Sequence, residues 1–227
     1  MAILNQPIRY REIMKPPYDC KKVLERLKKG NQAHLDQAKA QSQSSKKIKN
    51  TDFVVKCASE GQEPYAAILT CADSRVIPEH IFNAGEGELF VVRVAGNIAS
   101  PETIASLEYA IAELNVGVIV VMGHEDCGAV KAAMQFALDQ KYLGYNLNQL
   151  VSHIVPSVEP GADPGNKKEL KQSTLKNAKK TSKMLREQSA ILRDAKGLLI
   201  CSAYYHLTDI PGAMQVDFSK ECDCKKA

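Results

Sequence analysis

Two short polar motifs contain the side chains of this sequence that are best suited to chemistry. The motif CADSRV provides Cys71, Asp73 and Arg75, and the motif GHEDCG provides His124 and Cys127. Two thiolates and one imidazole, with a fourth position left for solvent, are the ligand set of a catalytic zinc site, whereas structural zinc sites have four protein ligands. Sulfur and nitrogen donors also favour zinc over magnesium or calcium. The two motifs therefore predict a catalytic Zn²⁺ site formed by the two cysteines and the histidine.

Asp73 and Arg75 predict a second part of the same site. They flank Ser74, so a turned backbone can bring the carboxylate and the guanidinium together. Such a pair keeps the carboxylate ionised as a hydrogen-bond acceptor, able to orient a zinc-bound hydroxide. Zinc neutralised by two thiolates should acidify water less than zinc held by three histidines, where the water pKa is about 7. We therefore expect activity that rises on the alkaline side of neutrality.

The elements that must position these motifs can be read from the apolar pattern. Four short aliphatic runs, at residues 66–69, 89–94, 117–122 and 198–203, are typical of strands buried on both faces of a parallel sheet. Helical patterns alternate with them. One follows the capping sequence Ser100-Pro101-Glu102, and a second begins near Gly128. This alternation predicts an α/β fold, with a central, mainly parallel β-sheet flanked by helices.

Both motifs directly follow predicted strands, at the edge of the sheet where open α/β folds bind their ligands. We divide the chain into an N-terminal helical arm and polar connection (1–50), a zinc domain (51–218) and a loose C-terminal tail (219–227). The arm is expected to contain a helix at about 20–35, followed by a mobile connection or a frayed helix. A loop is expected at 160–166, and one or two surface helices with a basic face at 167–193.

Composition excludes several classes of protein. The 227 residues carry a net charge of +4 and include 6% aromatic residues and no Trp, which argues against a nucleic-acid partner. No apolar run approaches the roughly 18 residues of a membrane span, and the first residues lack the pattern of a signal peptide. We therefore expect a cytoplasmic protein with no membrane partner. Its other cysteines are expected to be free thiols, in the core at Cys20, Cys57 and Cys201, or in the tail at Cys222 and Cys224.

The segments CADSRV, ELFVVRVAGN, SLEYAI and VVMGHEDCGAV resemble the β-class carbonic anhydrases, over residues 64–130. The resemblance implies a zinc enzyme that reversibly hydrates CO₂ to bicarbonate and a proton by a zinc-bound hydroxide. It also implies self-association as a homodimer or a homotetramer. By similarity, the zinc ligands are Cys71, His124 and Cys127, and the catalytic dyad is Asp73 with Arg75.

Three further positions match the substrate pocket of the plant-like branch of that family, namely Gln62, Phe90 and Tyr109. The amide of Gln62 can donate a hydrogen bond to an oxygen of CO₂ or bicarbonate, and the two rings can wall an apolar gas. In the family, such residues complete the pocket of the neighbouring protomer. One departure is the pair Glu125-Asp126 between two ligands, which could lower the acidity of the zinc water or simply face solvent.

Two alternatives remain open. The same site could hydrolyse a CO₂ analogue such as COS or CS₂, in which case the zinc chemistry is shared and the access channel differs. The protein could instead be a catalytically idle scaffold stabilised by zinc, whose Lys-rich surface at 167–183 binds an acidic partner. The presence of Asp73, Arg75 and Gln62 argues against the scaffold.

Overall fold

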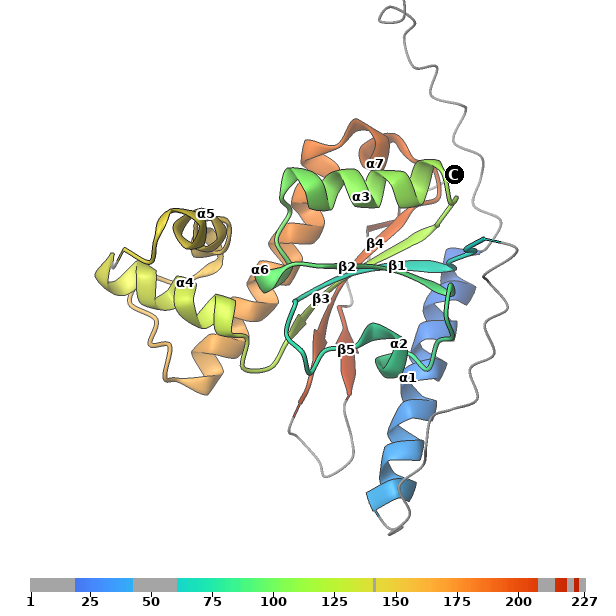
Figure 1. Cartoon of the computed structure of the whole chain (residues 1–227), viewed down its shortest axis with the longest axis horizontal. Coiled ribbons are helices and arrows are strands. Elements are labelled where there is room, and N and C mark those ends of the chain that lie inside the picture. Colours follow the sequence, from blue (N-terminus) through green and yellow to red (C-terminus); the bar gives the residue numbers. More distant parts are fainter. Residues whose placement is uncertain (1–18, 43–60, 141, 208–214, 220–222, 225–227) are drawn as a thin grey trace, which may run out of the picture.

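The computed structural model describes residues 19–42, 61–140, 142–207, 215–219 and 223–224. A central sheet is flanked by helices on both faces, and a pair of helices projects beyond one end of the strands (Figure 1).

The sheet confirms the predicted α/β architecture. Its parallel strands are β1 (Ala66–Thr70), β2 (Leu89–Arg93), β3 (Val118–His124) and β4 (Leu199–Tyr205), in the spatial order β2-β1-β3-β4. The short strands β5 (Val216–Phe218) and β6 (Asp223–Cys224) both pair antiparallel with β4. The four aliphatic runs of the sequence therefore form the parallel part of the sheet, and β1 and β3 are buried along their whole length.

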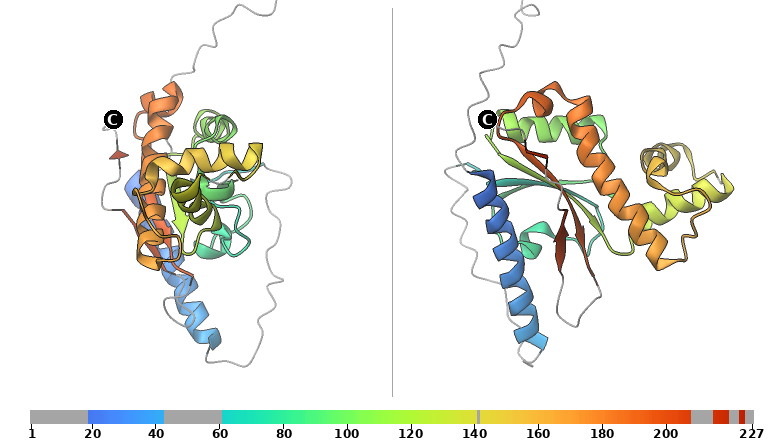
Figure 2. Two further views of the ribbon diagram at one scale, coloured as in Figure 1. Left: turned by 90° about the vertical axis from the view of Figure 1, so that its left-hand side faces the viewer. Right: turned by 180° about the vertical axis from the view of Figure 1, so that it is seen from behind.

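Alternate residues of each strand face opposite layers of helices. On one face, Ile68, Val120 and Cys201 pack with α1 (Cys20–Ser42) and α2 (Pro78–Ile81). On the other face, Leu69 and Val121 pack with α3 (Pro101–Ala112), α6 (Lys167–Gln188) and α7 (Ala190–Asp194). Figure 2 shows these layers from one side and from behind, on either side of the twisted sheet.

A third apolar cluster lies beyond the carboxyl ends of the strands. It is formed by α4 (Gly128–Asp139), α5 (Tyr145–Ile154) and the 3-10 helix η2 (Val155–Ser157), and it includes Cys71 and Cys127. The motif cysteines thus sit where the sheet meets this projecting helical pair.

Local sequence explains where the flanking helices begin. The Ser100 hydroxyl accepts the backbone N–H of Thr103, and Pro101 occupies the first turn of α3, as its capping sequence predicts. The Asn166 side chain caps α6 by accepting two backbone N–H groups of the first turn. The helix α6 buries Leu170 and Leu185 and exposes most of its lysines, which confirms the expected surface helices at 167–193.

The two ends of the chain differ in how they compare with the predictions. Helix α1 continues to Ser42, in agreement with the frayed-helix alternative for the start of the connection, and residues 43–50 of that connection lie outside the described residues. The tail at 219–227, expected to be loose, contributes β6, because its backbone pairs with β4 at Leu199 and Ile200. Cys57 and Cys222 lie outside the described residues.

Among the residues that the structure describes, no helix is both long enough and apolar enough to cross a bilayer.

Candidate metal centre

The candidate site lies at the point where the connections of the sheet diverge. Strand β1 connects to β2 on one side, and β3, its neighbour on the other side, connects to β4 beyond it. Cys71 comes one residue after β1, His124 is the last residue of β3, and Cys127 is the residue before α4. Such a switch point opens a crevice at the carboxyl ends of the strands. The order of the strands therefore brings the two sequence motifs together.

The side chains of Cys71, His124 and Cys127 form one compact buried cluster. One donor atom from each lies within 4.8 Å of the other two. The two sulfur atoms are 4.0 Å apart. Two sulfurs on a tetrahedral zinc ion with Zn–S bonds of about 2.3 Å would be about 3.8 Å apart. The cluster therefore has the dimensions of a zinc ligand set.

The imidazole of His124 is oriented for metal binding. Its Nδ1 lies 2.8 Å from the backbone carbonyl oxygen of Glu125, so Nδ1 carries the proton and donates it to that oxygen. Its Nε2 is fully buried and has no hydrogen-bond partner among the described residues. A histidine ligand is typically held in this way, with one ring nitrogen bound to a carbonyl and the other facing the ion. An orphaned, buried nitrogen beside two thiols is accounted for by a metal ion.

The two thiols share their protons unequally in the metal-free chain. The pKa of Cys71 is lowered to about 4, first because the Cys127 thiol donates a hydrogen bond to it. The side chain of His124 and the backbone N–H of Gly96, 3.3 Å from the Cys71 sulfur, act in the same direction. The pKa of Cys127 is raised by its hydrogen bond to Cys71 and by burial. The pair thus holds one thiolate and one thiol, and a divalent cation would displace the remaining proton.

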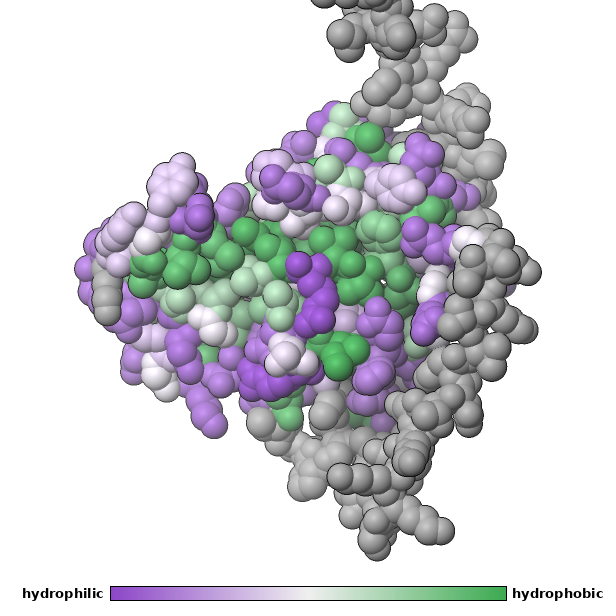
Figure 3. Space-filling model, viewed as in Figure 1, coloured by the Kyte–Doolittle hydropathy of each residue, from purple (hydrophilic) through white to green (hydrophobic). Residues whose placement is uncertain are grey.

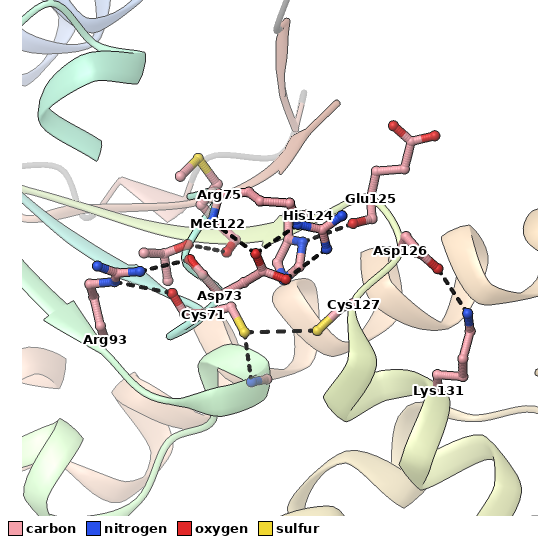
Figure 4. A network of polar contacts seen from close by, with 12 residues as sticks. Cys71, Asp73, Arg75, Arg93, Met122, His124, Glu125, Asp126, Cys127 and Lys131 are labelled. Atoms are coloured by element: carbon pink, nitrogen blue, oxygen red, sulfur yellow. Dashed lines mark hydrogen bonds and ion pairs between the residues drawn. The ribbon is translucent and has the colours of Figure 1, made fainter. Parts of the chain in front are cut away.

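Asp73 and Arg75 form the predicted ion pair beside this cluster (Figure 4). The guanidinium Nε donates to Oδ1 at 2.9 Å, and an Nη donates to Oδ2 at 2.7 Å. The backbone N–H of Arg75 also donates to Oδ1, at 3.0 Å. These hydrogen bonds from Arg75 hold the pKa of the Asp73 carboxyl well below its usual range. The ionised carboxylate faces the cluster, with Oδ2 3.9 Å from Nε2 of His124.

Comparisons with known proteins agree with this geometry. Residues 66–212 match the family model described as Carbonic anhydrase. The chain belongs to the carbonic anhydrase family. It is 46% identical over 105 residues to "Carbonic anhydrase 2" of Mycobacterium tuberculosis, which covers 46% of this chain and 51% of that protein. It is 35% identical over 158 residues to a carbonic anhydrase of Mycolicibacterium smegmatis, covering 66% of this chain and 74% of that one. The chain thus spans about half the length of the first of these relatives.

Solved structures place the fold in the β class of that family. A tetrameric β-carbonic anhydrase of the ascomycete Sordaria macrospora superposes with a TM-score of 0.63 at 24% identity, covering 72% of this chain and 84% of that chain. The Coccomyxa β-carbonic anhydrase in complex with acetazolamide has a TM-score of 0.61 at 24% identity, covering 91% and 89% of the two chains. These likenesses concern the fold, which is that of a β-class carbonic anhydrase.

The two acids between His124 and Cys127 point away from the cluster (Figure 4). The carboxylate of Glu125 accepts the backbone N–H of Leu207 at 2.9 Å, and its own backbone N–H donates to the carbonyl of Tyr205 at 2.8 Å. Glu125 therefore ties the metal loop to the end of β4. Asp126 adopts the left-handed conformation that the turn needs, with φ 52°, and pairs with Lys131 at the surface.

The three predicted pocket residues lie away from the metal centre of their own chain. Phe90 pairs with Ala67, four residues before Cys71, which at about 3.3 Å per residue places it about 13 Å back along the sheet. Tyr109 projects from α3 against Phe90, with ring centroids 6.2 Å apart. Gln62 is exposed and precedes the amino end of β1. Within one chain, the structure brings together the two rings but not the rings and the cluster.

Two contributors to the candidate metal centre were not predicted from the sequence. The backbone N–H of Gly96 donates to the Cys71 sulfur, and the guanidinium of Arg93 binds the backbone that follows β1. Arg93 is a lone charge at the end of an apolar strand. A charge in that position is a signal for a functional residue, but the backbone groups that Arg93 binds depend on the register of β2 against β1.

Proposed function

We propose that this protein is a zinc-dependent carbonic anhydrase that reversibly converts CO₂ and water into bicarbonate and a proton. One observation carries the proposal. A buried set of two sulfurs and one imidazole nitrogen, within 4.8 Å of one another, lies beside a carboxylate held ionised by a guanidinium. Three protein donors leave one coordination position for solvent, which distinguishes a catalytic zinc site from a structural one.

The chain's own side chains supply binding and orientation. Cys71, His124 and Cys127 would hold zinc, which acts as a Lewis acid and makes a nucleophile available from water near neutral pH. Asp73 would accept a hydrogen bond from the solvent molecule in the site. That hydrogen bond would orient the solvent oxygen towards the carbon of CO₂. Arg75 keeps that carboxylate ionised, so Asp73 accepts a hydrogen bond and does not retain the proton. The proton of the reaction leaves to buffer.

We further propose that a second copy of the chain completes the substrate pocket. Gln62, Phe90 and Tyr109 would donate a hydrogen bond to substrate oxygen and form apolar walls, yet they lie far along the sheet from their own cluster. Tyr109 is 49% exposed although its ring contacts Phe90, so much of this aromatic side chain remains available to another surface. A band of apolar residues crosses the face seen in Figure 1, from the α4–α5 pair towards the β1–β2 edge (Figure 3). Such a band suits contact with another copy, as a homodimer or a homotetramer.

The direct test is stopped-flow hydration of CO₂ across pH, with zinc content measured on the same sample. We expect about one zinc per chain, and turnover that rises from about pH 7 towards pH 9, because two thiolates reduce the charge of the ion. Failure to turn over CO₂ in a zinc-loaded sample would refute the proposal. Turnover of COS or CS₂ alone would assign the site to that hydrolysis, and salt-sensitive capture of an acidic partner without any turnover would favour a scaffold.

Asp73→Asn tests the role of the carboxylate. The amide can still bond to Arg75 through its oxygen, but it lacks the charge and presents a donor to the site. We expect zinc content to stay at the wild-type level and kcat/KM for hydration to fall by roughly 10–100-fold. Asp194→Asn is the matched control, because Asp194 is an exposed residue of α7, before the amino end of β4, and should leave turnover unchanged. Full activity in Asp73→Asn would remove Asp73 from the mechanism.

A further inference from the structure

Arg93 connects the edge strand β2 to the turn that carries the first half of the metal centre. It is the last residue of β2, and its register partner Thr70 is the last residue of β1. Its guanidinium reaches over the end of β1, where Nη2 donates to the carbonyl oxygen of Asp73 at 2.7 Å and Nε donates to that of Cys71 at 3.4 Å. Figure 4 shows both hydrogen bonds starting from the one guanidinium group.

The turn in question holds two chemically different groups. Cys71 provides a sulfur of the cluster, and Asp73, two residues later, provides the carboxylate beside it. The directions of these two side chains depend on the orientation of the peptide groups at 71–73. Arg93 holds the carbonyls of both residues at once. Among the described hydrogen bonds, no other side chain binds the backbone of both Cys71 and Asp73.

Neighbouring backbone contacts fix the rest of this segment. The N–H of Val94 donates to the carbonyl of Thr70 at 3.1 Å, and the N–H of Gly96 donates to the Cys71 sulfur at 3.3 Å. The N–H of Val76 closes the turn on the carbonyl of Asp73 at 3.0 Å. Backbone N–H groups of Val94 and of η1 (Ala95–Asn97) thus hold one side of the turn after β1, and the guanidinium of Arg93 adds side-chain hydrogen bonds to the same turn.

The guanidinium suits this task for a reason of shape. Its donors form a rigid, planar fork, so two acceptors bound by it are fixed relative to each other. A lysine ammonium offers donors on a flexible stem and would hold one carbonyl without orienting the second. Errors of about 1 Å in the placement of catalytic groups are costly, and partners that orient metal ligands typically contribute 10–100-fold to metal affinity or activity.

We propose that Arg93 is a positioning residue that sets the orientation of the Cys71 sulfur relative to the Asp73 carboxylate. It acts through the backbone carbonyls of those residues and touches no reacting atom. Its consequence for turnover rests on the proposed hydration of CO₂, whereas its consequence for metal binding does not.

The test compares Arg93→Met, Arg93→Lys and the control Arg193→Met. The control removes an exposed arginine of α7 that pairs with its neighbour Asp194. Zinc affinity is measured by competition with a chromogenic chelator, and ligand geometry by the visible spectrum of the cobalt-substituted protein. We expect Arg93→Met to bind zinc about 10-fold more weakly, to shift the cobalt bands and to lower kcat more than it changes KM. Arg93→Lys should fall between Arg93→Met and wild type, and Arg193→Met should match wild type.

Chemical rescue separates positioning from a general effect on folding. Arg93 is exposed, so its removal in Arg93→Ala leaves a site open to solvent. Guanidinium chloride at low, non-denaturing concentration should restore part of the zinc affinity and turnover, whereas sodium chloride at equal ionic strength should not.

Each outcome decides one claim. Wild-type zinc affinity, cobalt spectrum and turnover in Arg93→Met would overturn the role of Arg93. Should Arg93→Met fail to fold, equal behaviour of Arg93→Lys and wild type in all three measurements would overturn it as well. A wild-type protein that does not hydrate CO₂, but whose cobalt spectrum still depends on Arg93, would refute the proposed function and leave the positioning role standing.

Discussion

At the scale of single residues, the charge of the candidate metal centre is set by the single proton that two neighbouring sulfurs share. Isolated cysteines have a pKa of about 8.5 and are mostly neutral at pH 7. Here the Cys127 thiol donates to the Cys71 sulfur across 4.0 Å, and the pKa of Cys71 falls to about 4. A lowered pKa means that the thiolate persists at any pH above that value and is protonated as the pH drops through it. The metal-free site therefore presents an anion to an arriving cation at neutral pH.

This pairing can be tested by titrating the thiolate absorbance of zinc-free protein. We expect one thiolate equivalent to remain at neutral pH and to disappear as the pH falls through about 4. In Cys127→Ala, the main cause of the shift is gone, so the Cys71 thiolate should disappear at a distinctly higher pH. Cys201→Ala, a buried core cysteine on the α1 side of the sheet, is the control and should keep the acidic step. An unchanged titration in Cys127→Ala would contradict the pairing.

The sequence predicted the donor atoms of the site but not the contacts that orient them. The motifs containing Cys71, Asp73 and His124 could be recognised because the chemistry itself dictates their residue types. The carbonyl of Glu125 that orients His124, and the fork of Arg93, act on backbone atoms. Backbone atoms are the same in every residue, so no side-chain pattern marks them before the strand register is known.

At the scale of elements, the short helix η1 links β2 to the cluster through a single glycine. Gly96 has φ 73°, a conformation that side chains rarely adopt, and its N–H points at the Cys71 sulfur. A Cβ at this position would lie 2.5 Å from Cδ1 of the buried Ile154 and 3.2 Å from Cβ of Ala129. The glycine therefore allows both close packing against α4 and α5 and a hydrogen bond to the Cys71 sulfur of the cluster.

Gly96→Ala should weaken both packing and metal binding. Strain of this kind costs about 1–3 kcal/mol, and a displaced N–H removes a hydrogen bond that favours the thiolate. We expect a lower free energy of unfolding, measured in urea on the metal-free protein, and a lower zinc affinity measured with a chelator. Gly128→Ala is the matched control, because its Cβ would meet nothing within 4 Å in the first turn of α4. Equal stability and affinity in the two variants would contradict this account of η1.

The elements that the sequence predicted are those with a strong periodic signal. The strands β1, β3 and β4 are aliphatic runs buried along their whole length, and α3 carries its own capping residues, so local pattern and tertiary fold agree. The prediction of burial on both faces is wrong for β2, which lies at the edge of the sheet and is only partly buried. The continuation of α1 to Ser42 runs through a polar stretch with no apolar period. The strands β5 and β6 have three and two residues and exist because β4 offers them an edge. Short pairings of this kind are decided by the partner strand.

At the scale of the whole molecule, one chain contains both a metal cluster and a pair of rings but keeps them apart. Phe90 lies about 13 Å along the sheet from the level of Cys71, at about 3.3 Å per residue. A pocket that uses both must therefore combine parts of two chains. In a closed pair related by two-fold symmetry, each chain then gives its cluster to one pocket and its rings to the other.

Mixing two defective chains tests this arrangement. The first carries Asp73→Asn and keeps its pocket residues. The second carries both Gln62→Ala and Tyr109→Ala, and keeps its cluster. Gln62 and Tyr109 are exposed in the single chain, so the second variant should still fold. Each variant alone should be weakly active in stopped-flow hydration of CO₂.

Co-expression of the two should restore activity if the pocket is shared between chains. Random pairing makes half of the dimers mixed, and each mixed dimer has one intact pocket out of two, so about one quarter of wild-type turnover should return. If each chain instead built its pocket alone, every pocket in the mixture would lack either the carboxylate or the walls, and activity would stay at the average of the two parents. The estimate of one quarter assumes that the two chains pair at random. Co-expression of wild type with a chain that carries all three substitutions, followed by measurement of turnover, serves as the control for that assumption. Rescue would therefore show that a working pocket combines the cluster of one chain with the exposed aromatic ring of α3 from another chain.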